Sequence, residues 1–132
     1  MVSYHGASYL SFIRDPRVTA DSMFEGEGII LDPSYSVEKR VRVAGGDGGF
    51  NMHEFQVIND GRTVLAETGD RKLVDFPKFG LGHGSGYISD GIFMEIDLTT
   101  DKEVFKWQSI DHVSPNESYT EQTAFDKAWD YL

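Results

Sequence analysis

The 132-residue sequence has no cysteine, only four prolines and no apolar run long enough to span a membrane. Disulfide bonds and thiolate metal sites are therefore excluded. Basic residues are scarce, 12 against 22 acidic ones, and the net charge is −10. This charge argues against nucleic acid and anionic membranes as partners, because both attract basic surfaces. Residues 1–6 lack the positive flank and apolar stretch of a signal peptide, so the sequence leaves the compartment open.

Aromatic residues and glycine are abundant, and both favour strands joined by turns. Aromatic residues make up 13% of the chain, and there are 14 glycines. The clearest hairpin pairs residues 54–58 with 63–68 around Asn59-Asp60-Gly61, since Asn and Gly readily adopt the positive φ of tight turns. A second hairpin pairs residues 92–98 with 103–109, whose apolar residues recur at every second position.

These two hairpins together form one four-stranded unit, and residues 9–43 contain three further strands. Repeated four-stranded units are typical of a β-propeller. The sequence therefore predicts an all-β fold, a β-propeller fragment of about two four-stranded blades with glycine-rich loops. We expect an incomplete blade over residues 1–46, a complete blade over 47–113, and a connector into a missing blade over 114–132. Residues 69–90 are expected to form a long glycine-rich insertion, of the kind that is usually functional or mobile.

Several segments follow one another along the chain in a specific order. They are Gly28-Ile29-Ile30-Leu31-Asp32-Pro33-Ser34-Tyr35, Met52-His53-Glu54-Phe55, Met94-Glu95-Ile96-Asp97-Leu98, Phe105-Lys106-Trp107-Gln108-Ser109-Ile110-Asp111-His112-Val113 and Trp129-Asp130-Tyr131-Leu132. In this combination, which covers nearly the whole chain, they resemble the fungal arylsulfotransferase family. Two features depart from the family pattern: no histidine precedes Gly28 in its glycine-rich stretch, and none follows Leu132.

The resemblance implies a chemistry. Related bacterial aryl sulfotransferases are propellers that move a sulfuryl group from a phenolic sulfate ester to a phenol through a sulfated histidine. Neutral imidazole is a suitable nucleophile for this step, and neighbouring cations can stabilise the transferring oxygens. No nucleotide donor, other cofactor or metal is implied. Such proteins are often secreted, and their partners would be small aromatic sulfates and phenols.

His53 is the first candidate for the sulfated residue, because it opens the predicted innermost strand near the channel. His112 is the second candidate and follows Asp111 at the end of the outer strand pair. Each histidine also has a structural interpretation, as a side chain that fixes one blade to the next or to a carboxylate. His83 is interpreted as a solvated loop residue, and His5 carries no argument.

The acidic residues around the second hairpin are interpreted as a solvated face rather than a carboxylate pair or calcium site. A propeller pocket needs several converging blades, so we expect this segment alone to have no turnover. We also expect self-association through open blade edges and bare sheet faces. The alternative function is a non-catalytic propeller that binds a protein or glycan.

Overall fold

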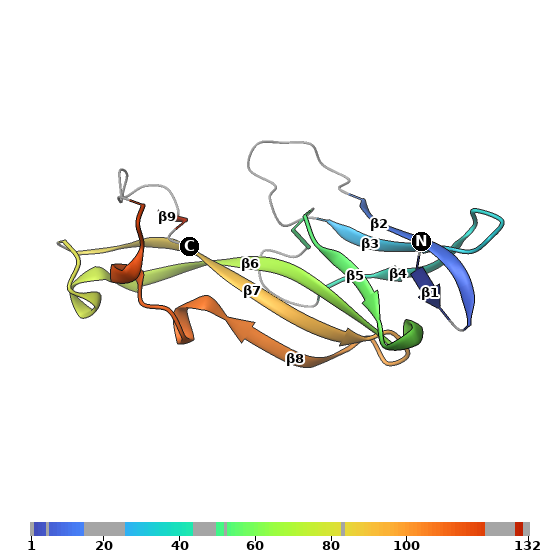
Figure 1. Ribbon diagram of the computed structural model, residues 1–132. Coiled ribbons are helices and arrows are strands. Elements are labelled where there is room, and N and C mark those ends of the chain that lie inside the picture. Colours follow the sequence, from blue (N-terminus) through green and yellow to red (C-terminus); the bar gives the residue numbers. More distant parts are fainter. Residues whose placement is uncertain are drawn as a thin grey trace.

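The computed structural model describes residues 2–4, 6–14, 26–43, 50–51, 53–82, 84–120 and 129–130. They form two antiparallel sheets that pack face to face (Figure 1). The described part contains no closed barrel, and its only helical segments are four short 3-10 turns. Within these ranges no helix has the length and apolar character needed to cross a bilayer. The predicted all-β class is confirmed, because the described residues form two stacked sheets that are consistent with a propeller fragment.

The first sheet has the strand order β1-β2-β3-β4. Its strands are β1 (Val2–Tyr4), β2 (Ala7–Arg14), β3 (Glu27–Leu31) and β4 (Val37–Val41). Three of these correspond to the predicted strands, and β1 adds a fourth on the free edge of β2. The β3–β4 turn is stabilised by Asp32, whose Oδ1 accepts hydrogen bonds from the backbone N–H groups of Ser34 (2.8 Å) and Ser36 (2.9 Å).

The second sheet has the order β5-β6-β7-β8. Its two central strands, β6 and β7, extend well beyond the outer strands β5 and β8. The strands are β5 (Phe55–Ile58), β6 (Thr63–Asp75), β7 (Ser85–Asp97) and β8 (Lys102–Gln108). The short β9 (Trp129–Asp130) pairs in parallel with β7 beyond the end of β8. Both predicted hairpins are confirmed, and they lie in a common sheet as expected. Asn59 and Gly61 adopt the positive φ values predicted for Asn and Gly in this turn, 52° and 83°, and Asp60 between them also has a positive φ of 56°.

The expected irregular insertion over residues 69–90 is wrong for most of its length. β6 and β7 continue through it as one long hairpin, paired from Thr63–Asp97 to Asp75–Ser85. Only the tip is irregular, with the 3-10 turn η2 (Phe76–Phe79) followed by glycines of positive φ. Buried Phe76, Ile88 and Trp129 hold this end together as a second core. The alternation that places Ile88 in phase with Ile92 was present in the sequence but was obscured by the surrounding glycines.

The main core lies between the two sheets. It contains Tyr4, Ile30, Val41, Phe50, Val64, Ala66, Ile92, Met94, Ile96 and Leu98. Gly28 allows the sheets to approach closely, because a Cβ at that position would lie 2.1 Å from the ring of Phe55. Lys39 adds a polar link, since its Nζ lies 2.7 Å from a carboxylate oxygen of Asp101 in the second sheet. Each sheet therefore buries one face and leaves its other face outward.

Candidate functional site

The outward face of the second sheet contains a hollow of about 280 Å³. It is lined by Glu54, Gln56, Leu65, Ala66, Phe93, Met94 and Phe105. The strand register places Gln56, Leu65, Glu95 and Phe105 in one row across β5, β6, β7 and β8. Aromatic walls and a few polar groups suit a small aromatic ligand.

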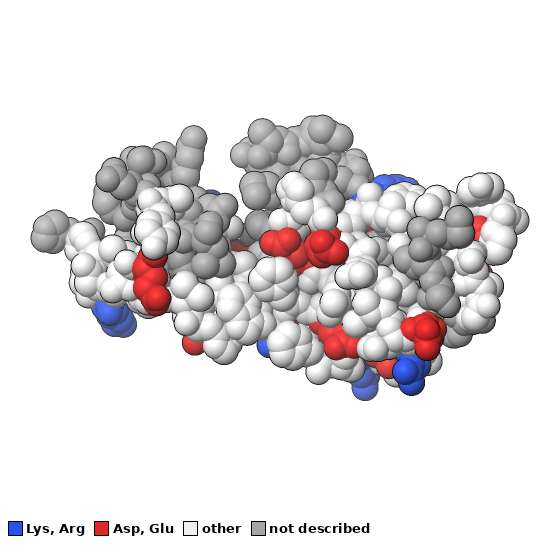
Figure 2. All heavy atoms as spheres, in the orientation of Figure 1, with Lys and Arg blue, Asp and Glu red and all other residues white. Residues whose placement is uncertain are grey.

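Figure 2 shows acidic atoms over the region where β5 begins and β6 passes in Figure 1. Glu54 immediately precedes β5, and Glu67 lies in β6 one position beyond the Phe55–Ala66 pair. The two carboxylates therefore occupy neighbouring positions on the outward face. The side of the hollow near β5 is acidic, while its β7–β8 side is aromatic.

His53 lies two residues before β5 and is exposed. Its backbone N–H donates to Asn51 Oδ1 at 3.1 Å, and its ring Nδ1 contacts the same oxygen. A neutral imidazole that donates from Nδ1 in this contact has its lone pair on Nε2, the ring nitrogen that can then act as a nucleophile. The neighbouring Glu54 lines the hollow.

His112 lies just beyond the 3-10 turn η3 (Ser109–Asp111), which follows β8. Its ring stacks on Trp107, with ring centroids 5.1 Å apart and planes inclined by 7°. Trp107 in turn contacts Phe93, a residue of the hollow, with centroids 5.6 Å apart. His112 therefore ends an aromatic row that begins in the hollow.

The two candidate histidines are not brought together. β5 and β8 are the outer strands of a four-stranded path, so His53 and His112 flank opposite edges of the sheet. Three strand spacings separate these edges by roughly 14 Å. Neither histidine forms a hydrogen bond or ion pair with an arginine of the described residues. His83 and His5 lie outside those residues.

Asp90 is a buried charged residue that sequence reasoning missed. Its carboxylate contacts Lys72 Nζ (2.7 Å) and accepts hydrogen bonds from the Ser109 hydroxyl (2.7 Å) and the Ile110 N–H (3.0 Å). Burial raises the pKa of Asp90, but the hydrogen bonds from Lys72, Ile110 and Ser109 outweigh it and hold the pKa below its ordinary value. This network anchors η3 on β7 and so sets the backbone that leads to His112. The sequence contained a sign of this burial: Asp90 lies two residues from both Ile88 and Ile92, so the alternation of the strand places all three on the buried face.

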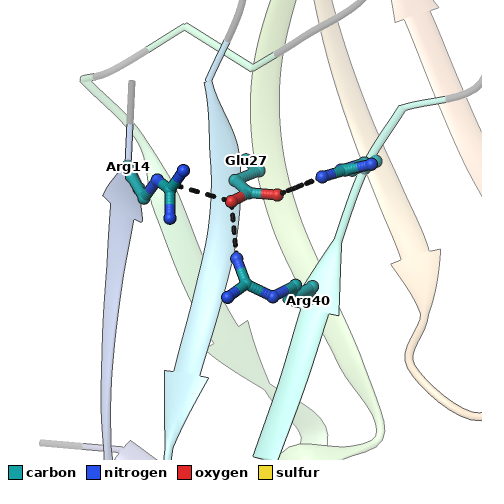
Figure 3. A network of polar contacts seen from close by, with 4 residues as sticks. Arg14, Glu27 and Arg40 are labelled. Carbon is teal, nitrogen blue, oxygen red and sulfur yellow. Dashed lines mark hydrogen bonds and ion pairs between the residues drawn. The ribbon is translucent and has the colours of Figure 1, made fainter. Parts of the chain in front are cut away.

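A second network surrounds Glu27 on the outward face of the first sheet (Figure 3). Arg40 Nη1 donates to Glu27 Oε1 at 2.6 Å, and Arg42 donates to Oε2 through Nε (3.0 Å) and Nη2 (2.8 Å). Arg14 Nε lies 3.6 Å from Oε1. The hydrogen bonds from Arg42 lower the pKa of Glu27 against the opposing effect of burial, with help from the charges of Arg40 and Arg14. Three arginines around one carboxylate leave a local charge of +2.

Among the described residues, no three His, Asp or Glu side chains converge in a group that could hold a metal ion. The described arrangement instead places a histidine ring held by Asn51 next in sequence to Glu54, which lines a hollow with aromatic walls. No curated protein and no solved structure matches the chain. A family model described as Arylsulfotransferase (ASST) matches residues 29–131.

Proposed function

The chain belongs to the arylsulfotransferase family, and from this premise we propose that its second sheet contributes to sulfuryl transfer between phenols. In this proposal His53 is the acceptor of the sulfuryl group, and the hollow beside Glu54 receives the aromatic ring. The observation that carries the assignment is the contact of the His53 ring Nδ1 with Asn51 Oδ1, which orients the ring and leaves Nε2 without a protein partner among the described residues. His112 has no such orienting hydrogen bond in the described part of the chain.

The proposed reaction has two displacements at sulfur. His53 Nε2 attacks the sulfur of an aryl sulfate, the S–O bond to the aromatic ring breaks, and the released phenolate takes up a proton. The hydroxyl oxygen of a second phenol then attacks the same sulfur, the N–S bond breaks, and the acceptor's proton is released. Phe93 and Phe105 would position the ring by stacking, because offset aromatic contacts favour defined geometries.

A mass measurement tests the assignment of His53. The chain is incubated with p-nitrophenyl sulfate, digested, and searched for a peptide that has gained one sulfuryl group. We expect the label on the peptide that contains His53, and we expect it to disappear in His53→Gln but persist in His112→Gln. Because both histidines are exposed, neither substitution should perturb folding, which circular dichroism checks. A label that persists in His53→Gln and disappears in His112→Gln would transfer the role to His112.

The absence of any described arginine beside either histidine favours a second candidate function. Sulfuryl oxygens need cationic neighbours in the transition state, and the described part of the hollow is acidic instead. The alternative is a propeller module that binds an aromatic or cationic partner without turnover. Saturable binding of a cationic aromatic probe such as benzylammonium, with no label on any histidine after incubation with p-nitrophenyl sulfate, would support this alternative.

A further inference from the structure

The two outward sheet faces each expose a group of large apolar side chains. On the second sheet, Leu65, Phe93 and Phe105 are between 37% and 53% exposed. On the first sheet, Leu10, Phe12 and Val37 are between 41% and 46% exposed. The register places Leu10 beside the partly exposed Leu31, and Leu31 beside Val37, so this second group is continuous across three strands. Apolar groups of this kind mark contact surfaces.

The face of the second sheet carries uncompensated negative charge. Glu54 and Glu67 lie at neighbouring positions of β5 and β6, and Glu95 lies opposite Leu65 in the next strand. None of these three carboxylates forms an ion pair within the described residues. Like charges on adjacent strands are destabilising, so this face gains most from a cationic partner.

The face of the first sheet carries the complementary charge. Arg14, Arg40 and Arg42 surround Glu27 and leave two positive charges beside Phe12. Their side chains are 54%, 44% and 73% exposed, so the guanidinium groups can reach a second molecule. Arginine is well suited to such a contact, because its planar fork can bind two carboxylates at once.

We propose that copies of this chain associate head to tail. The outward face of β1–β4 of one copy packs against the outward face of β5–β8 of the next, and repeats the sheet-on-sheet packing inside each copy. Apolar side chains meet in the centre, and the arginines around Glu27 lie against Glu54, Glu67 and Glu95 of the neighbour. Contact between two identical faces is disfavoured, because it would bring like charges together.

A head-to-tail contact joins two different surfaces, so each added copy presents a new free face. Such contacts close into a ring when the rotation allows and otherwise continue as an open chain. Propellers close with about four to eight sheets, so two to four copies with two sheets each would complete a ring. The inference goes beyond the proposed function, since it requires no activity of His53. The two uses of this face exclude each other, because Leu65, Phe93 and Phe105 also line the hollow proposed for the aryl ring, and a neighbouring copy packed there would fill it.

Sedimentation velocity over a range of protein concentrations tests the proposal with two single-face variants. Phe105→Asp blocks the face of the second sheet, and Phe12→Asp blocks that of the first. Burial of one phenylalanine corresponds to about 10- to 100-fold in the dissociation constant, so each variant alone should be weakened by that factor. Tyr119→Asp is the matched control, because Tyr119 is fully exposed away from both faces. It should associate as the unmodified chain does.

Mixing the two variants gives the decisive result. Phe105→Asp retains a functional first-sheet face and Phe12→Asp a functional second-sheet face, so an equimolar mixture should form a 1:1 dimer and nothing larger. The dimer should weaken several-fold between 50 and 500 mM NaCl, since salt screens the charge contacts. The proposal is overturned if the unmodified chain stays monomeric at all concentrations, which would leave these faces to a different partner. It is equally overturned if either variant alone forms a dimer as tight as the mixed one.

Discussion

Replacing Asp90 by alanine should be among the most destabilising single changes in the second sheet. The side chain is fully buried, and its carboxylate joins Lys72 to the Ser109 hydroxyl and the Ile110 N–H. Alanine removes the acceptor from both buried donors and the counter-charge from the ammonium group. The second sheet would then lose the attachment of η3 to β7.

The magnitude follows from the burial of the partners. Removing one member of a buried ion pair costs about 3–5 kcal/mol of unfolding free energy. The side chain of Lys72 is 32% exposed, so water can solvate its ammonium group once the carboxylate is removed. The expected loss of unfolding free energy is therefore at the lower end of that range, about 3 kcal/mol. For a chain of this size that corresponds to a fall in Tm of roughly 10–15 °C. Asp90→Asn should cost less, about 2 kcal/mol, because its amide oxygen can replace Oδ1 and still accept from both Ser109 and Ile110, whereas Lys72 and Gln108 lose the acceptor Oδ2.

Urea denaturation followed by tryptophan fluorescence measures these free energies. The matched control is Asp111→Asn, since Asp111 is exposed in the same turn η3 and has no side-chain hydrogen bond or ion pair within the described residues. Its cost should stay within about 0.5 kcal/mol. The reasoning would be refuted if Asp90→Ala and Asp111→Asn had equal effects.

The pH dependence gives an independent check. Burial raises the pKa of Asp90, yet its hydrogen bonds hold the pKa below the ordinary value of 3.8. A carboxyl group with a lowered pKa stabilises the fold above its unfolded-state pKa, and loses that contribution as the pH falls through the folded-state value. The stability difference between the unmodified chain and Asp90→Asn should therefore be constant at neutral pH and shrink below about pH 4. A difference that grew on acidification would contradict this assignment.

Two further changes test the packing between strands and sheets. Gly28→Ala should cost about 1–3 kcal/mol in urea denaturation, because the added methyl group collides with the Phe55 ring; a cost below 0.5 kcal/mol would mean that the ring moves freely. Glu27→Gln should cost about 2 kcal/mol, less than for a fully buried pair since the arginines are partly exposed. Because the pKa of Glu27 is lowered in the folded chain, the difference from the unmodified chain should begin to shrink below about pH 4.5 and disappear only as the pH falls through the lower folded-state pKa. A pH-independent cost would exclude the ionised carboxylate as its cause.

Local sequence signals predicted the two hairpins of the second sheet well. Asn59-Asp60-Gly61 supplies the backbone conformations that a tight turn requires, and alternation over residues 92–98 identifies the buried face of β7. The ordered segments from Gly28 onward also indicated the family that the match over residues 29–131 establishes. These features are readable because turn geometry and strand periodicity depend on neighbouring residues.

The long β6–β7 hairpin was missed for the opposite reason. Glycines near residues 80–91 indicate a loop when taken by themselves, but seven paired positions, from Gly69–Gly91 to Asp75–Ser85, and a small separate core stabilise the strands there. Pairing of this kind overrides the low strand propensity of the glycines, because the stability of a strand depends on what packs against it across the sheet.

The sequence by itself determined that the chain is all-β, where its principal turns lie, which alternating residues of its strands face the core, and to which family it belongs. Only the tertiary structure decided that Asn51 orients His53, that His112 stacks on Trp107 at the opposite edge, and that Asp90 and Glu27 centre two charged networks. Each of these arrangements joins residues on different strands or at a strand end. Periodicity specifies which way a side chain faces, whereas register and sheet packing decide which side chain it meets.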